Sequence, residues 1–294
     1  MFRGDLKMSE LHQIGILKIG AIGAAPLLDL LLDERAERKD IAMCVVTTGA
    51  SMDPKQCEEA TKVLAGANPS VVLIVSPNAS LPGPTKAREI LLEKKIPILS
   101  ISDGPSKKAF YKKNEEGKKV KSVPEGSDFI ILPMDPMIGA RKEFLDPTEM
   151  AIFNADLIKV LSCTGVMRLL QSEIDKLVES VKAGKDLKLP TINLKTEKAL
   201  AQAEFSNPYA YAKAYAALKM CESVADITSA ACFKESDPAV YVPAVAAAHE
   251  LLRAAAILAD DAREIEKQND SVLRTPHGSS GKVQKKTKLD EKPA

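Results

Sequence analysis

Apolar residues in the first half of the chain gather in short runs, and these runs predict the strands of a parallel sheet. Each run is followed by a segment with helical spacing. The runs cover residues 13–19, 41–46, 71–75, 96–101 and 129–132. A strand that is covered on both faces has no polar side, so it reads as a nearly continuous apolar run. The pattern therefore predicts an α/β fold with a Rossmann-like, mostly parallel sheet.

After Asp146 the spacing becomes that of helices. The segment Asp146-Pro147-Thr148-Glu149 predicts a helix start, with aspartate at the cap and proline in the first turn. Apolar spacing then continues past Leu177, which predicts one long helix. Asn207-Pro208 starts another helix, and residues 241–268 form a third. We expect this half to be a helical bundle with a small irregular or β segment near residues 187–194.

The change of pattern divides the chain into four expected parts. Residues 1–12 are an N-terminal extension, 13–145 an α/β ligand-binding domain, 146–277 a helical-bundle domain and 278–294 a polar C-terminal tail. We expect the tail to be mobile or to be ordered by a partner subunit. The lysine-rich stretch 111–126 is expected to be a solvated loop.

Composition excludes several classes of function. The 41 basic and 40 acidic residues nearly cancel, so no global positive field argues for nucleic acid and no basic amphipathic helix argues for a membrane. The start of the chain lacks a long apolar run, and no segment approaches about 18 uninterrupted apolar residues, so we expect none to span a membrane. We therefore expect a cytoplasmic protein. The five cysteines form no Cys-x-x-Cys pair and only three histidines occur, so we expect no metal.

The helical half is rich in alanine, above all between Ala244 and Ala256. Small side chains let helices approach one another closely, and these helix faces carry few polar side chains. We expect part of this surface to be buried between the subunits of a homo-oligomer.

The first predicted strand–helix turn has only the outline of a dinucleotide-binding loop. A nicotinamide fingerprint requires Gly-x-Gly-x-x-Gly, but Lys18 stands at the first position, before Gly20 and Gly23. An acidic residue should also end the second strand to hold a ribose, yet that strand ends at Thr47-Thr48-Gly49. The sequence therefore disfavours NAD, and a turn that serves only the fold remains an alternative.

Loops rich in Gly, Pro and small polar residues follow the later strands. They begin at Ser76-Pro77-Asn78, Ser102-Asp103-Gly104 and Asp135-Pro136. Open α/β sheets bind ligands at this edge. The sequence contains no nucleophile elbow, Walker loop or His-Glu-x-x-His pattern. Hydride transfer between two bound organic rings needs none of these, because positioning and electrostatics supply the rate. The same loops also fit a protein that only binds its ligands.

The chain resembles the F420-dependent methylene-tetrahydromethanopterin dehydrogenases of archaea. The longest matching run is Asp135-Pro-Met-Ile-Gly-Ala-Arg-Lys-Glu-Phe-Leu-Asp-Pro-Thr-Glu-Met150. Shorter matches lie at residues 30–36, 76–78, 82–84, 86–89, 102–105, 207–210, 247–250, 262–267 and 272–277. Many members of this family have an asparagine where this chain has Ala21.

The resemblance implies reversible hydride transfer between methylene-tetrahydromethanopterin, or its sarcinapterin form, and coenzyme F420 in methanogenesis or its reversal. It implies F420 as a dissociable co-substrate, without a metal or a bound flavin. It also implies a cleft between the α/β domain and the bundle, and a hexamer built as a trimer of dimers.

The chemistry of these ligands suggests roles for the loop residues. Both ligands are anionic, so the cations Lys86, Arg88, Lys107, Lys108, Arg141 and Lys142 are candidates to meet them. The methenyl product is a cation, and a nearby carboxylate would stabilise it as charge develops. We choose Asp135 for this catalytic role, with Asp103 and Glu143 behind it.

The remaining site residues are assigned to the two ligands. F420 is expected to contact Gly20, Gly23, Ser76, Pro77, Asn78, Asp103, Gly104 and Lys107. The pterin is expected to contact Arg141, Lys142, Glu143 and His277.

Two alternatives stay open at this point. One is a nicotinamide-dependent pterin dehydrogenase on the same scaffold. The other is a non-catalytic oligomer that binds deazaflavin or pterin.

Overall fold

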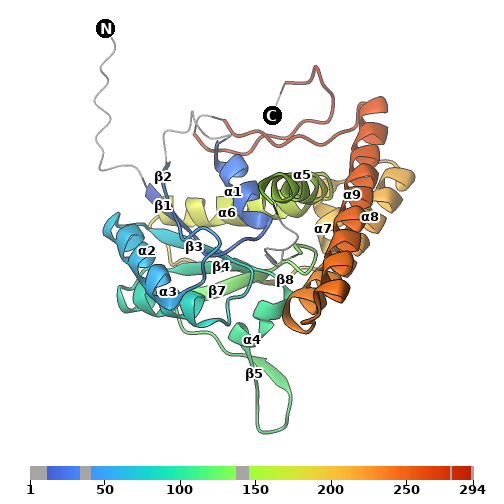
Figure 1. The fold of residues 1–294 in the computed structure, drawn as a ribbon. Helices are drawn as coiled ribbons and strands as arrows, with labels where there is room; N and C mark the ends of the chain where they lie inside the picture. Colours follow the sequence, from blue (N-terminus) through green and yellow to red (C-terminus); the bar gives the residue numbers. More distant parts are fainter. Residues whose placement is uncertain (1–11, 34–40, 137–145, 279, 293–294) are drawn as a thin grey trace.

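The central feature of the computed structural model is a six-stranded sheet, in which every pair of neighbouring strands is parallel. The structure describes residues 12–33, 41–136, 146–278 and 280–292. The strand order is β2-β1-β3-β4-β7-β8 (Figure 1). The strands are β1 (His12–Lys18), β2 (Ile41–Thr47), β3 (Val71–Ser76), β4 (Ile98–Ser102), β7 (Ser127–Ile131) and β8 (Thr191–Asn193). The predicted α/β fold is confirmed.

Helices cover both faces of this sheet (Figure 1). They are α1 (Ala24–Asp33), α2 (Pro54–Gly66), α3 (Pro82–Glu93), α4 (Lys107–Phe110), α5 (Pro147–Cys163), α6 (Val166–Lys182), α7 (Thr196–Ala203), α8 (Pro208–Phe233) and α9 (Pro238–Gln268). Alternate residues of β3 show how the two cores form. Val71, Leu73 and Val75 join the core that contains α1, α5 and α6, whereas Val72 and Ile74 pack with α2 and α3. Because both faces are buried, each strand is apolar throughout.

The predicted β segment of the second half adds a strand to the sheet. β8 pairs in parallel with β7, and Ile192 is buried. The Thr191 hydroxyl donates to the Asp128 carboxylate at 2.8 Å and 2.9 Å. The sheet is therefore completed by residues that lie far along the chain from its other strands.

The long helix predicted after Asp146 is wrong in one respect, because it breaks into α5 and α6 with a bend of 69°. Gly165 stands at the break with a φ of +92°, a conformation that favours glycine. A Cβ atom here would lie 2.1 Å from the carbonyl oxygen of Ala199 in α7. Close packing of α7 thus requires a glycine, and the apolar spacing alone gives no sign of the bend.

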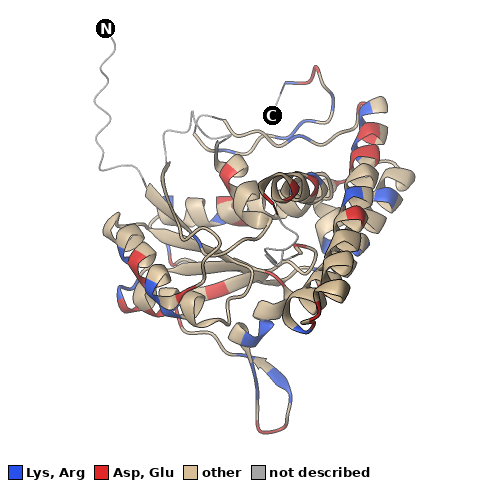
Figure 2. Cartoon of the chain, viewed as in Figure 1, with Lys and Arg blue, Asp and Glu red and all other residues tan. Residues whose placement is uncertain are grey.

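The stretch predicted as a solvated loop forms a short hairpin. β5 (Tyr111–Lys113) and β6 (Lys119–Lys121) pair antiparallel and project from the sheet (Figure 1). Gly117, with a φ of +74°, helps to close the turn, and the Lys118 amide donates to Asn114 Oδ1 at 2.8 Å. Lysines line its strands and acidic residues its turn (Figure 2). Residues 112–121 are exposed, as expected of a solvated loop, but they belong to a hairpin with two short strands.

The described part of the C-terminal tail pairs with residues of its own chain, and its mobility and any ordering by a partner subunit stay predictions. Arg274 and Lys286 exchange backbone hydrogen bonds of 2.8 Å and 3.0 Å. A second bridge joins His277 to Val283. The tail thus doubles back over α6 as a narrow antiparallel ribbon (Figure 1).

The long helix α9 packs along α8 and α5. Among the described residues it is the one single helix with the length and apolar content of a membrane span, and the bent α5–α6 pair also passes that test. A helix in the core of a water-soluble protein has the same properties. Ala248, Ala255 and Ala259 of α9 are buried in the core, so its alanines are explained by helix packing.

Candidate functional site

The loops that follow β1, β3, β4 and β7 meet at the carboxyl-terminal edge of the sheet. The chain reverses its winding direction between β1 and β3, since the strand order runs β2-β1-β3-β4. At such a point the loops on either side diverge and leave space for a ligand. The structure therefore brings together most of the loops that the sequence singled out.

Gly20 and Pro77 place the first two of these loops against each other. Gly20 has a φ of +81°, which favours glycine. A Cβ atom at this position would lie 3.0 Å from Pro77 Cδ and 3.1 Å from Met52 Cγ. The loop after β1 thus passes close over the loop after β3, and a larger residue would separate them.

Asp135 binds the N-terminus of α1. Its Oδ1 accepts from the Gly23 amide at 2.8 Å, and its Oδ2 accepts from the Ala24 amide at 2.7 Å. The side chain is fully buried. Burial raises the pKa of this carboxyl group to about 7, and the hydrogen bonds from the two backbone amides oppose the rise. A helix N-terminus stabilises a negative charge, so Asp135 has donors for its ionised form although water cannot reach it.

Asp103 lies near Asp135 but lacks equivalent donors. It is 3% exposed, and its Oδ1 has no hydrogen-bond partner among the described residues. Burial is the main cause that raises the pKa of Asp103, and the charge of Asp135 adds to it. Two buried carboxylates in one field do not both ionise readily. The pair therefore carries one negative charge before it carries two.

A chain of hydroxyl groups joins the loops after β3 and β4. The Ser102 hydroxyl donates to the Ser76 carbonyl oxygen and also bonds to the Ser106 hydroxyl. Ser106 Oγ in turn accepts from the Ala79 amide at 2.8 Å. Sequence reasoning assigned Ser76 to the site and named Ser102 at the start of a loop, but it gave no role to Ser102 or Ser106. The available signal was a serine at the end of an otherwise apolar strand, repeated in the loop that follows.

The other residues assigned to F420 lie in the same loops. Asn78 Oδ1 accepts from the Ser80 amide at 3.0 Å and so shapes the turn after β3. Gly104 begins the 3-10 helix Gly104–Ser106, and a Cβ atom there would meet open space. Lys107 is exposed. These positions are compatible with ligand contact, and their roles stay predictions.

Arg88 is only partly exposed, as Lys86 is, whereas Lys107 and Lys108 are exposed. Its guanidinium carbon lies 5.6 Å from the centre of the Phe110 ring, and its Nη2 donates to Thr85 Oγ1 at 3.1 Å. Burial lowers its pKa to about 10, and nearby Glu89 opposes this. Arg88 thus remains a cation behind the loop after β3.

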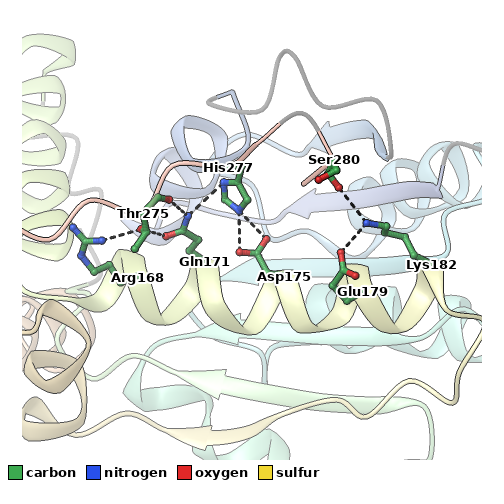
Figure 3. Close-up of polar contacts among 8 residues, drawn as sticks. All are labelled: Arg168, Gln171, Asp175, Glu179, Lys182, Thr275, His277 and Ser280. Atoms are coloured by element: carbon green, nitrogen blue, oxygen red, sulfur yellow. Dashed lines mark hydrogen bonds and ion pairs between the residues drawn. The ribbon is translucent and has the colours of Figure 1, made fainter. Parts of the chain in front are cut away.

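The four predicted pterin contacts fall into two groups. Arg141, Lys142 and Glu143 lie outside the described residues. His277 packs on α6, where its Nε2 lies 2.9 Å from Asp175 Oδ2 and its side chain is 1% exposed (Figure 3). Its described partners are residues of α6 and the tail, so the structure does not bring it to Asp135. A pterin contact by His277 stays a prediction that this packing does not favour.

The described residues contain no group of three or more His, Cys, Asp or Glu side chains that could hold a metal ion. The described side chains at this edge of the sheet supply hydroxyl groups, two buried carboxyl groups and the exposed cation Lys107.

Comparison with known proteins gives a consistent result over nearly the whole chain. Residues 12–294 match the family model of methylene-5,6,7,8-tetrahydromethanopterin dehydrogenase. The F420-dependent methylenetetrahydromethanopterin dehydrogenase of Archaeoglobus fulgidus is 54% identical, over 96% of this chain and 98% of that protein. The enzyme of the same name from Methanothermobacter marburgensis is 50% identical, over 96% of this chain and 99% of that protein.

A solved structure shares the fold. It is an F420-dependent methylene-tetrahydromethanopterin dehydrogenase in complex with methylene-tetrahydromethanopterin and coenzyme F420. The two chains align with a TM-score of 0.88 and 43% identity, over 97% of this chain and 100% of the other. This chain therefore belongs to the methylene-tetrahydromethanopterin dehydrogenase family.

Proposed function

We propose that this protein transfers a hydride reversibly between methylene-tetrahydromethanopterin and coenzyme F420. The observation that carries this proposal is the full-length structural match to an enzyme that holds both molecules. In the oxidative direction a C–H bond of the pterin methylene group breaks, and its electron pair leaves with the hydrogen. The deazaflavin C5 accepts this hydride, and the pterin becomes the methenyl cation.

The loops at the edge of the sheet supply what such a reaction requires. Hydride transfer depends on holding two rings in contact and on the local field, without a protein nucleophile. Gly20 and Pro77 define a rigid surface where the loops after β1 and β3 meet. Both ligands carry negative groups, for which Lys86, Arg88 and Lys107 are candidate partners.

Asp135 is our candidate for the negative charge that stabilises the methenyl cation. The amides of Gly23 and Ala24 stabilise its ionised form, whereas Asp103 Oδ1 has no donor among the described residues. Asp135 is fully buried, so it acts through its field and by holding the start of α1. Preorganised charge of this kind is effective because it need not reorient during the reaction.

The assay mixes purified protein, F420 and methylene-tetrahydromethanopterin and follows the absorbance of the oxidised deazaflavin. Rapid loss of that band is the expected result. Turnover with NAD(P) alone would instead identify a nicotinamide-dependent enzyme. Ligand binding without turnover would identify a protein that only binds. Parallel reactions with the tetrahydrosarcinapterin derivative test which pterin is preferred.

The assembly and setting are also proposals. We infer a homo-oligomer, a hexamer built as a trimer of dimers, in an archaeal cytoplasm, where the reaction serves methanogenesis or its reversal. Apolar side chains on the outside of the helical half support association: Tyr209, Phe233, Val240 and Ile257 are each more than half exposed. Light scattering at several protein concentrations measures the mass, and a monomer at all of them contradicts this part.

A further inference from the structure

A cavity lies between α6, α9 and the C-terminal tail, apart from the loops of the candidate site. Its volume is about 730 Å³, which falls within the range of roughly 300–1,000 Å³ typical of small-molecule sites. Apolar side chains, including Leu31, Met167 and Pro276, form part of its wall. No candidate residue for F420 is among its described lining residues.

Four cations line this cavity, which we call the arginine cavity: Arg168, Arg263, Arg274 and Lys286. They come from α6, α9 and the two strands of the tail ribbon. The described lining includes no Asp or Glu, and none of the four forms a salt bridge with a described residue. The arginine cavity thus concentrates positive charge from segments that are far apart in sequence.

The hydrogen bonds of these cations go to neutral acceptors. Arg168 donates to Thr275 Oγ1 at 2.8 Å (Figure 3). Arg274 donates to the Thr287 carbonyl oxygen at 3.0 Å, and Lys286 donates to the Leu289 carbonyl oxygen at 2.7 Å. These bonds orient the side chains but bring no negative charge to them.

The carboxylates around the arginine cavity already have partners. Glu266 accepts from the backbone amides of Ser206 and Asn207 at 3.0 Å and 2.8 Å, at the start of α8. Glu204 pairs with Lys285 at 2.8 Å, and Asp175 pairs with His277. Asp175 and Glu204 thus have partners of their own, whereas the donors to Glu266 are neutral. Glu266 lines an adjoining pocket with Arg168 and Arg263, so its charge offsets one of the four cations and leaves an excess of positive charge.

The neighbouring positive charges affect the pKa of Arg168. Burial is the largest cause that lowers its pKa to about 10, and the charges of Arg263 and Arg274 lower it further, with Glu204 opposing. Arg168 stays protonated at neutral pH. The four cations are each only partly exposed, and holding them together is unfavourable unless an anion joins them.

We propose that the arginine cavity binds a small anion that carries phosphate groups. Guanidinium groups present paired donors that match phosphate oxygens, so three arginines from different segments form a suitable receptor. The bound anion would also tie the tail to α6 and α9. This proposal does not rest on hydride transfer, since the two sites share no assigned residue.

The test titrates inorganic pyrophosphate into the full-length protein, without F420 or pterin, and follows the heat of binding and the melting temperature. Sodium chloride at equal ionic strength corrects for screening. Arg263→Gln is the informative variant, because its guanidinium makes no hydrogen bond with a described residue and can be removed without breaking one. Arg253→Gln is the matched control, being an exposed arginine of the same helix.

We expect saturable binding and a rise of about 2 °C or more in melting temperature for the unaltered protein and for Arg253→Gln. For Arg263→Gln we expect the half-saturating pyrophosphate concentration to rise roughly tenfold, the scale of one lost charged contact. Arg274→Gln, with the same expectation, replaces it if Arg263→Gln does not fold by circular dichroism.

Absence of saturable binding overturns the proposal, as does unchanged affinity in both cavity variants. Light scattering provides a third outcome. If pyrophosphate has no effect but Arg263→Gln lowers the molecular mass, an acidic group of a second copy fills the cavity, and the proposal is wrong. None of these measurements uses the hydride-transfer assay, so the two proposals can fail separately.

Discussion

The substitution Asp135→Asn tests whether a buried carboxylate at the start of α1 governs how stability depends on pH. Asparagine has nearly the same shape, but it carries no charge and has one acceptor oxygen in place of two. Its amide group would face either the Gly23 or the Ala24 amide, which are 2.8 Å and 2.7 Å from the carboxylate. One buried N–H group then loses its partner, at a cost of about 1–3 kcal/mol at any pH.

The pH-dependent part follows from the pKa values of the two states. Burial raises the pKa of Asp135 to about 7 in the folded protein, against about 3.9 in the unfolded chain. Between these values the folded protein holds a proton that the unfolded chain has released. Stability is therefore greatest at low pH and falls as pH rises through about 7. The loss accumulates over the roughly two pH units between about pH 5 and about pH 7 and levels off by about pH 8, for a total of roughly 2–3 kcal/mol.

Urea unfolding at these two pH values, at fixed protein concentration, measures the effect. Asp135→Asn should be less stable than the unaltered protein at about pH 5, and this deficit should shrink by roughly 2–3 kcal/mol at about pH 8. Asp53→Asn is the matched control, since Asp53 also accepts from two backbone amides, at 3.0 Å and 3.1 Å, but at an exposed helix start. Equal deficits at both pH values for Asp135→Asn would refute the reasoning.

Three further predictions concern the site and the tail. Asp135→Asn should slow hydride transfer about tenfold or more and flatten its pH profile near 7, whereas Asp103→Asn, which keeps a neutral polar group, should slow it less; equal effects in stopped-flow assays contradict this assignment. Gly23→Ala should lose about 1–3 kcal/mol of stability, because its Cβ atom would lie 2.4 Å from Leu157 Cδ2. Calorimetry should show a lower melting temperature for Gly23→Ala. The control Gly66→Ala, whose added Cβ atom would meet open space, should leave the melting temperature unchanged. His277→Gln should speed hydrogen exchange in the tail without changing the KM for the pterin. A raised KM with unchanged hydrogen exchange would instead support the predicted contact between His277 and the pterin.

Sequence patterns predicted the sheet well because burial on both faces makes each parallel strand apolar along its own length. Val71 to Val75 is apolar throughout, since one set of side chains meets α1 and α6 and the other meets α2 and α3. The loops at the strand ends were predictable for the same reason. Once parallel strands are identified, their carboxyl ends must share one edge of the sheet.

Features that depend on distant contacts left no local signal. The bend at Gly165 arises because the Ala199 carbonyl oxygen occupies the space a side chain would need, while the apolar spacing continues across it. The ribbon formed by Arg274 and Lys286 consists of backbone hydrogen bonds, and these are independent of the polar side chains that suggested a mobile tail. The serine chain through Ser102 and Ser106 likewise requires two loops to meet.

The choice of Asp135 from sequence rested on its loop, but its physical role follows from a partner 112 residues away. Two nearby buried carboxyl groups compete for one charge. Asp135 holds it more readily because two amides of α1 donate to it, while Asp103 Oδ1 lacks a donor among the described residues. Asp103 then keeps its proton until higher pH, although it is the carboxyl group with an unpartnered oxygen. The charge and the unpartnered oxygen thus reside on different residues, and removing the charge of Asp135 should lower the pKa of Asp103, because that charge helps to raise it.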